Sequence, residues 1–191
     1  SMSNALYLMP NTRSAMKMGH SDVKDHMFLD GLEDAYDKGK LMGVFADDCA
    51  AHFGFTRAQQ DDFALASLSR AQKAIDAGYF TDEITPVTLT TRKGDIVVDQ
   101  DEQPGLARPE KIPSLRPAFK PEGTVTAANA SSISDGAAAL VMMKTSAAKK
   151  RGLDILATIK GHVTHAQDPS WFTTAPVESL RKLSARTGWA L

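Results

Sequence analysis

One cysteine and one histidine are spaced so that they could act together in nucleophilic catalysis. Cys49 and His52 lie three residues apart in the segment ADDCAAHFG. Residues three apart on a helix are neighbours, and an adjacent base can activate a thiol as a nucleophile. The other histidines, at positions 20, 26, 162 and 165, form no recognisable motif with this cysteine. Because free cysteines are among the most buried residues, we favour a structural cysteine beside an exposed histidine.

A second candidate is a run of short polar residues between two less polar segments. Thr124–Met143 reads TVTAANASSISDGAAALVMM. Thr124–Ala127 predicts a short β-segment, and the polar residues of Asn129–Asp135 can bond their own backbone in turns. The apolar run Ala137–Met143 predicts a strand buried on both faces of an α/β sheet. Ligands often bind at strand ends, and small residues allow a ligand or another backbone segment to approach closely. This segment could therefore be a ligand-binding turn. A tightly packed turn without a ligand is the alternative, and these residues alone do not decide between the two.

The clearest predicted helix starts at Thr56. Thr56 is a good N-cap, and Gln59 completes a capping-box pattern. The apolar positions of Ala64–Ile75 recur at helical spacing, and Gly78 stands where the helix should stop. Polar residues, Asp61 among them, are expected on the opposite, exposed side. The simplest role of this helix is structural.

Local patterns predict the remaining elements. They are helices over 42–53, 146–151 and 177–187, a hairpin of Ile84–Thr91 and Ile96–Asp99, and a half-buried strand over Ile155–Thr164. Between them, Asp101–Pro121 carries prolines at positions 104, 109, 113, 117 and 121, a spacing that leaves no room for a long element. A loop of about 20 residues is uncommon in a compact domain and is usually functional.

Composition narrows the class of protein. The 191 residues are 42% hydrophobic and 24% charged, with a formal net charge of -1. These values indicate a globular protein without the basic footprint of a nucleic-acid or membrane-surface binder. No apolar run approaches the length of a membrane span, and no signal peptide is recognisable. The single cysteine excludes an internal disulfide and favours a reducing compartment, so we expect a cytoplasmic protein.

Several blocks of the chain resemble the thiolase family of coenzyme A-dependent acyltransferases. GTVTAANASSISDGAAALVMM, from Gly123, is similar to the family's GTVTAGNAS…DGAAA segment. Other matching blocks follow the family's order: SMSN at the start, GL…MG over 31–43, FTRAQQDDFALASLSRAQKA from Phe55, RKGD from Arg92, LRPAF from Leu115 and TAPV from Thr174. The resemblance covers essentially the whole chain.

This resemblance implies a partial α/β fold of the layered α/β/α thiolase type. Residues 1–9 would end the N-terminal half, 10–123 would form an inserted, irregular α+β loop domain that binds coenzyme A, 124–150 would return to the first half, and 151–191 would begin the second. Family members are dimers or tetramers, so a homo-oligomer is expected, with tetramer contacts from Pro10–Met27. Acyl-CoA and coenzyme A would be substrates, with no metal, no covalently bound cofactor, and neither nucleic acid nor membrane as partner.

The resemblance also implies a coenzyme A pocket in this chain. Ser131 would hydrogen-bond the pantetheine arm, and Ala127 and Phe119 would line its tunnel. Apolar walls with a few placed polar groups suit such a ligand. Without the family match, plain core packing would be the first interpretation of Phe119.

Three further residues would extend this pocket. Leu32 and Met42 would pack near the acyl end, and Arg108 would face the phosphates. Core packing is the alternative for Met42, and an exposed, solvated arginine is the alternative for Arg108. Short-chain family members usually carry a histidine where this chain has Leu41, which favours a different or longer acyl substrate.

No catalytic residue can be carried over from the family. Its nucleophilic cysteine, its Asn-Glu-Ala-Phe block, its Gly-His-Pro histidine and its second cysteine have no counterpart here. Making or thiolytically cleaving a 3-ketoacyl-CoA needs a thiolate, a base and oxyanion donors. The chain is therefore expected to be inactive alone. It could be a piece of a thiolase, a subunit of a split thiolase, or a non-catalytic acyl-CoA-binding or assembly module. We favour the first, because the chain ends fall inside continuous family domains.

Overall fold

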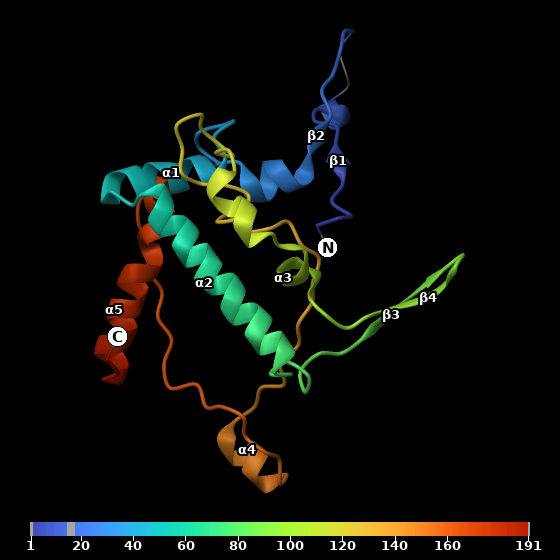
Figure 1. Cartoon of the computed structure of the whole chain (residues 1–191), viewed down its shortest axis with the longest axis vertical. Helices are drawn as coiled ribbons and strands as arrows, with labels where there is room; N and C mark the ends of the chain where they lie inside the picture. Colours follow the sequence, from blue (N-terminus) through green and yellow to red (C-terminus); the bar gives the residue numbers. More distant parts are fainter. Residues whose placement is uncertain (1, 15–17, 191) are drawn as a thin grey trace. The chain divides into compact units, whose positions relative to one another are not determined.

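The chain forms two compact units in the computed structural model, which describes residues 2–14 and 18–190. One unit joins Ser1–Cys49 to Ser132–Leu191, and the other consists of Ala50–Ser131. Figure 1 colours the chain from blue at the N-terminus to red at the C-terminus. Met16, in the expected contact segment Pro10–Met27, lies outside the described residues.

Helix α2 (Arg57–Asp76) is the main element of the Ala50–Ser131 unit. The predicted capping box is confirmed: the Thr56 hydroxyl accepts the N–H of Gln59 at 3.2 Å, and Gln59 Oε1 accepts the N–H of Thr56 at 2.9 Å. Gly78 follows the helix with a φ of 69°, a left-handed conformation that favours glycine. The predicted apolar face is half-buried. The prediction for Asp61 is wrong, because this residue is 5% exposed and paired with another side chain.

A β-hairpin follows α2. Strands β3 (Val87–Thr91) and β4 (Gly94–Val98) pair antiparallel, with Thr91 opposite Gly94. The predicted hairpin is thus confirmed, and Figure 1 shows it as a two-stranded arm in green. All of its residues are exposed.

Two short helices occupy the proline-rich segment. Helix α3 (Glu102–Leu106) and a 3₁₀ helix (Pro109–Ser114) lie within Asp101–Pro121. The prediction that no long element forms here is confirmed, but the interpretation of the whole segment as a loop is wrong. The first turn of a helix leaves its N–H groups without intrahelical partners, so Pro104 and Pro109 are accommodated there. Gln72 of α2 donates to the Pro104 carbonyl at 3.0 Å, which fastens α3 to α2.

The unit that joins Ser1–Cys49 to Ser132–Leu191 consists of short elements. They are β1 (Tyr7–Leu8) and β2 (Lys24–Asp25), which pair antiparallel, a 3₁₀ turn (Thr12–Ser14), a π-helical turn (Phe28–Leu32), α1 (Met42–Phe53), whose C-terminal end belongs to Ala50–Ser131, α4 (Thr145–Lys150), a 3₁₀ helix (Pro169–Thr174) and α5 (Ala175–Thr187). The three helices predicted over 42–53, 146–151 and 177–187 are confirmed within two residues at each end.

Aromatic packing and helix α5 join segments of the unit formed by Ser1–Cys49 and Ser132–Leu191. Phe45 is 3% exposed, and its ring meets that of Phe172 edge-on, with centroids 6.0 Å apart. Helix α5 lies along the segment 161–165: Arg186 donates to the His162 carbonyl at 2.8 Å. A Cβ atom on Gly161 would lie 3.1 Å from the Thr187 methyl group, so glycine lets this segment approach the helix.

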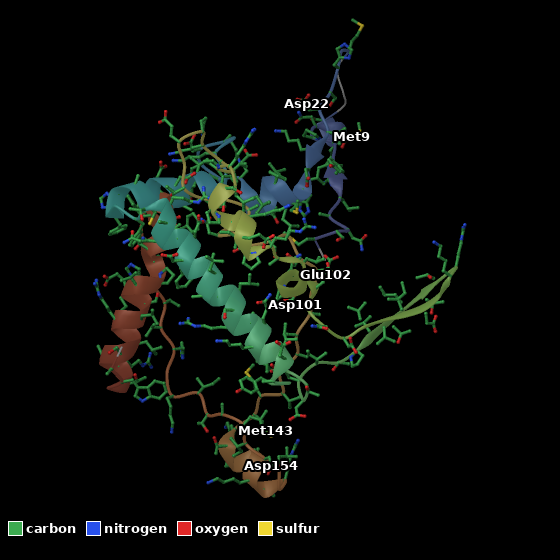
Figure 2. The ribbon with its side chains drawn as sticks, viewed as in Figure 1. Met9, Asp22, Asp101, Glu102, Met143 and Asp154 are labelled. Atoms are coloured by element: carbon green, nitrogen blue, oxygen red, sulfur yellow. The ribbon has the colours of Figure 1, made fainter. Side chains whose placement is uncertain are left out.

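Two predicted strands of this unit are not formed. Ala137–Met143 and Ile155–Thr164 are coil on either side of α4, as Figure 1 shows. Met143 and Asp154, labelled in Figure 2, flank that helix. A strand takes its hydrogen bonds from a neighbouring segment, and no paired neighbour lies beside these two within residues 2–14 and 18–190. The prediction of a doubly buried strand is therefore wrong here: Leu140 is 85% exposed.

Candidate functional site

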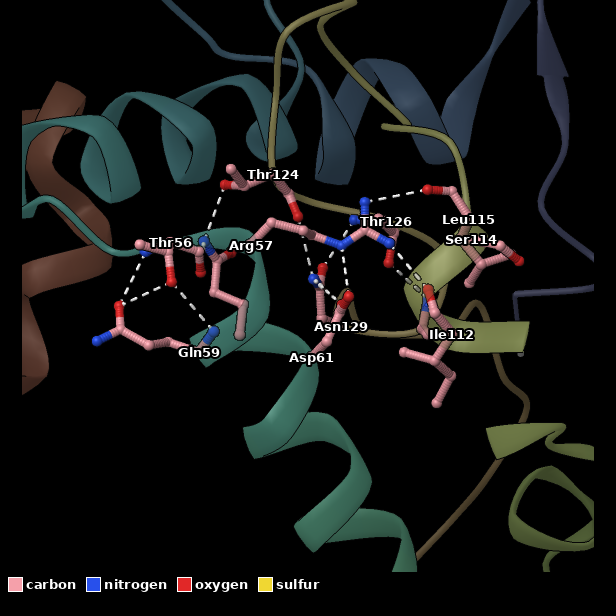
Figure 3. Close-up of polar contacts among 12 residues, drawn as sticks. Thr56, Arg57, Gln59, Asp61, Ile112, Ser114, Leu115, Thr124, Thr126 and Asn129 are labelled. Carbon is pink, nitrogen blue, oxygen red and sulfur yellow. Dashed lines mark hydrogen bonds and ion pairs between the residues drawn. The ribbon is translucent and has the colours of Figure 1, made fainter. Parts of the chain in front are cut away.

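A partly buried ion pair on α2 links three segments of the Ala50–Ser131 unit (Figure 3). Arg57 Nε lies 2.7 Å from Asp61 Oδ2, one helical turn away. The Asp61 side chain is 7% exposed and the Arg57 side chain 24%. The other two arms of the guanidinium donate to the Leu115 carbonyl at 3.0 Å and the Ile112 carbonyl at 2.9 Å. Arg57 therefore joins α2 to the 3₁₀ helix Pro109–Ser114 through a fixed fork of donors.

Asn129 connects this ion pair to the polar turn. Its Nδ2 donates to Asp61 Oδ1 at 3.3 Å and to the Thr124 carbonyl at 3.1 Å, as Figure 3 shows. Its Oδ1 accepts the N–H of Thr126 at 2.7 Å. The N–H of Ala130 closes the turn by donating to the Thr126 carbonyl at 3.0 Å. The prediction that short polar side chains bond their own backbone is thus confirmed for Asn129.

The segment 124–131 consequently contains a closed turn, Thr126–Ala130, and Ser131 follows it directly. The predicted β-segment Thr124–Ala127 is wrong, because no strand forms there: the Thr124 carbonyl and the Thr126 N–H bond to the Asn129 side chain, and the Val125 carbonyl accepts a bond from the N–H of Ala118. Thr126 is fully buried at 0% exposure, whereas Ala127 and Ser131 have exposed side chains. Ala127 and Ser131 are thus exposed to solvent, while Thr126 is buried and bonded to Asn129.

Sequence reasoning did not single out Arg57 and Asp61 as site residues. The signal that could have identified them is the spacing of opposite charges at i and i+4 on a helix. That spacing is common on exposed helix faces, where such pairs contribute little. Only their burial and their contacts with Ile112, Leu115 and Asn129 distinguish this pair.

Two more of the predicted site residues belong to the same unit. The N–H of Ala118 donates to the Val125 carbonyl at 2.8 Å, so the chain at Phe119 adjoins the turn. Phe119 is half-buried. Arg108 is exposed and precedes the 3₁₀ helix Pro109–Ser114. Within the part of the chain that the structure describes, Arg108 forms no hydrogen bond or ion pair with the turn.

Leu32 and Met42 belong to the other unit. Leu32 ends the π-helical turn and Met42 begins α1. An isolated β-bridge between Glu33 and Leu41 brings the two ends of this loop together. Both predicted residues flank that bridge and are half-buried, so the structure brings this pair close to each other.

A hollow of about 450 Å³ lies beside this loop. It is lined by Asp34, Tyr36, Asp37, Lys40, Phe45, Asp168, Pro169 and Ser170. The backbone N–H of Asp37, 2.6 Å from the Asp34 carboxylate, lowers the pKa of that group, and the N–H of Tyr36 at 2.9 Å adds to the effect, while burial opposes it. Across the described ranges, no group of three or more His, Cys, Asp or Glu residues is arranged to hold a metal ion.

Cys49 and His52 fit the structural interpretation of their spacing. Cys49 is half-buried in α1, and His52 is exposed. The His52 ring lies edge-on to that of Phe53, with centroids 4.8 Å apart.

Of the helices in residues 2–14 and 18–190, none is long and apolar enough to cross a membrane.

The chain is similar in sequence and in structure to known proteins. The chain matches the family model "Thiolase, N-terminal domain" over residues 1–146. It is 43% identical to the acetyl-CoA acetyltransferase of Pseudomonas aeruginosa, covering 100% of this chain and 49% of that protein. Acetyl-CoA acetyltransferase 2 of Arabidopsis thaliana is 46% identical, with coverages of 98% and 47%. The crystal structure of the Bacillus anthracis acetyl-CoA acetyltransferase matches with a TM-score of 0.92 at 35% identity, over 100% of this chain and 48% of that chain.

The chain belongs to the thiolase family. It spans about half the length of the curated relatives that it matches. Its fold is accordingly part of the α/β thiolase fold, which confirms the predicted fold class.

Proposed function

We propose that this chain supplies coenzyme A-binding surface to a thiolase-type acyltransferase, which makes or thiolytically cleaves a 3-ketoacyl-CoA. The observation that carries the proposal is the closed turn Thr126–Ala130, which Asn129 bonds to Asp61 and which the exposed Ser131 follows directly. The names of its relatives, which act on acetyl-CoA, support the same ligand class.

The turn has the chemistry that a pantetheine arm requires. The Ser131 hydroxyl can donate to an amide carbonyl of the arm or accept from its N–H. Ala127, with its small side chain, allows the ligand to approach the backbone, and Phe119 offers apolar surface beside it. Leu32 and Met42 would contact the acyl end, and Arg108 the phosphates. Leu41 stands where short-chain members usually carry histidine, so we propose a different or longer acyl group.

Ser131→Ala is expected to weaken coenzyme A binding three- to twelve-fold. One neutral hydrogen bond is worth about 0.5–1.5 kcal/mol, and each 1.4 kcal/mol changes a dissociation constant about tenfold. Isothermal titration of coenzyme A into both proteins measures the change, with circular dichroism as the folding control.

Ser132→Ala is the matched control. Its hydroxyl pairs with that of Ser134 at 2.8 Å, and no binding role is proposed for it, so its affinity should equal that of the wild type. Equal affinities in folded Ser131→Ala and wild-type chains would reduce Ser131 to a turn residue. An absence of binding by the wild-type chain would contradict the proposed site in this chain.

The 191-residue chain is expected to show no thiolase activity by itself. Its one cysteine lies half-buried in α1, outside any motif that matches the family nucleophile. Acetoacetyl-CoA cleavage assayed with free coenzyme A should therefore stay at background, and Cys49→Ala should not change it. Turnover by the pure chain that disappears in Cys49→Ala would overturn this catalytic interpretation.

Assembly and location stay predictions. A homo-oligomer with contacts from Pro10–Met27 follows from the family resemblance, and light scattering of the purified protein measures it. A cytoplasmic location rests on the single cysteine.

A further inference from the structure

The turn that precedes Ser131 is held by one of its own side chains, Asn129, and by two side chains of α2, Asp61 and Arg57. Arg57 is bonded to Asp61, Asp61 to Asn129, and Asn129 to the backbone of the turn. We propose that Arg57, Asp61 and Asn129 are positioning residues that preset this turn, and with it Ser131, for the ligand. The inference rests on the proposed coenzyme A site, and it adds residues that act on that site through the turn.

The direction of the hydrogen bonds supports this role. An ionised carboxylate only accepts hydrogen bonds, whereas an amide has a donor side and an acceptor side. Asp61 Oδ1 therefore requires Asn129 to present its NH₂ group to it, at 3.3 Å. That orientation leaves Asn129 Oδ1 facing the N–H of Thr126, at 2.7 Å. Asp61 thereby selects the one amide orientation that closes the turn.

Arg57 in turn fixes Asp61. Its guanidinium is held by the carbonyls of Ile112 and Leu115, so the Nε–H points at Asp61 Oδ2. The charged group in contact with Asn129 is Asp61, and Arg57 lies on the far side of Asp61. The segment around the 3₁₀ helix Pro109–Ser114 offers Arg57 only backbone carbonyls, those of Ile112 and Leu115. A binding turn that is already ordered spares the ligand the entropy of ordering it.

Amide hydrogen exchange of the ligand-free chain tests the positioning itself. Asn129→Ala removes the acceptor of the Thr126 N–H, so exchange at Thr126 and Ala130 should become about ten- to a hundred-fold faster, the range of one or two lost buried hydrogen bonds. Gln72→Ala is the control: it removes a comparable bond from α2, to the Pro104 carbonyl, away from the turn. Unchanged exchange in a folded Asn129→Ala chain would overturn the inference whether or not coenzyme A binds.

Asn129→Asp separates positioning from mere packing. Near pH 8 the introduced carboxylate would face that of Asp61, and two like charges this close raise the pKa of one of them. Once a proton binds to the pair, an O–H can take the place of the amide N–H between them. Coenzyme A affinity of Asn129→Asp, relative to wild type at each pH, should therefore recover about tenfold between about pH 8 and about pH 5. Asn129→Ala should show no such recovery.

Three outcomes decide the matter. Faster exchange in Asn129→Ala, together with recovery of Asn129→Asp at low pH, supports positioning. A pH-independent loss of affinity in both variants would make Asn129 a packing residue and overturn the inference. If the wild-type chain fails to bind coenzyme A, the proposed function fails for this chain, and the exchange result still decides whether the three side chains position the turn.

Discussion

Arg57→Ala is expected to destabilise the Ala50–Ser131 unit by about 3 kcal/mol. Breaking a buried ion pair by removing one partner costs about 3–5 kcal/mol, because a charge is left buried without its counter-ion. Asp61 would be that charge, since its side chain is 7% exposed. The value falls at the lower end because the Arg57 side chain is 24% exposed, and water can enter where it stood.

Urea unfolding followed by circular dichroism measures this effect, because α2 contributes strongly to the helical signal. Arg70→Ala is the matched control: Arg70 is exposed on the same helix, and its loss should cost within about 0.5 kcal/mol. Asp61→Ala should cost less than Arg57→Ala, because the arginine left behind keeps its bonds to two carbonyls. Equal costs for Arg57→Ala and Arg70→Ala would show that the buried pair does not hold the unit together.

Phe45→Ala is expected to cost about 3–5 kcal/mol, the range for removing a buried aromatic ring. Phe45 is 3% exposed and packs edge-on against Phe172. Lys40 Nζ also lies 4.0 Å from the centre of the Phe45 ring, a cation–π contact that the substitution would remove. The loss should fall on the unit that joins Ser1–Cys49 to Ser132–Leu191.

Phe63→Ala provides the comparison for this second prediction. Phe63 is 74% exposed on α2, so its truncation should change the free energy of unfolding by about 0.5 kcal/mol or less. Chemical denaturation of both variants and the wild type gives the two values. A cost below about 1 kcal/mol for Phe45→Ala would mean that the site collapses around the lost ring or that Phe45 is not central to the packing.

Helices were the part of this chain that local sequence could predict. Helix α2 begins where Thr56 and Gln59 can cap it and stops before Gly78. Helix α5 ends at Gly188, which has a φ of 75°. A helix makes its hydrogen bonds within itself, and its caps come from residues at its own ends. The hairpin β3–β4 was predictable for a similar reason, because its two strands are neighbours along the chain.

The candidate site was predictable only in its outline. The resemblance to thiolases directed attention to Ser131, Ala127 and Phe119, and the turn that carries Ala127 and precedes Ser131 is present. Asp61, which accepts the bond from Asn129, lies 68 positions earlier in the chain. No local pattern in α2 indicates that one of its polar residues is buried, because burial depends on what another segment places over it.

The sequence by itself determined the family, the helices and their caps, the hairpin, and the polar character of the turn. Only the tertiary structure decided that Asp61 is buried and Arg57 half-buried, how Asn129 is oriented, and that Ala137–Met143 stays coil in this chain. The physical reason is the range of the interactions. Caps and helical bonds join residues within a few positions, whereas strand ladders and buried charge pairs take their stability from segments that are distant in sequence.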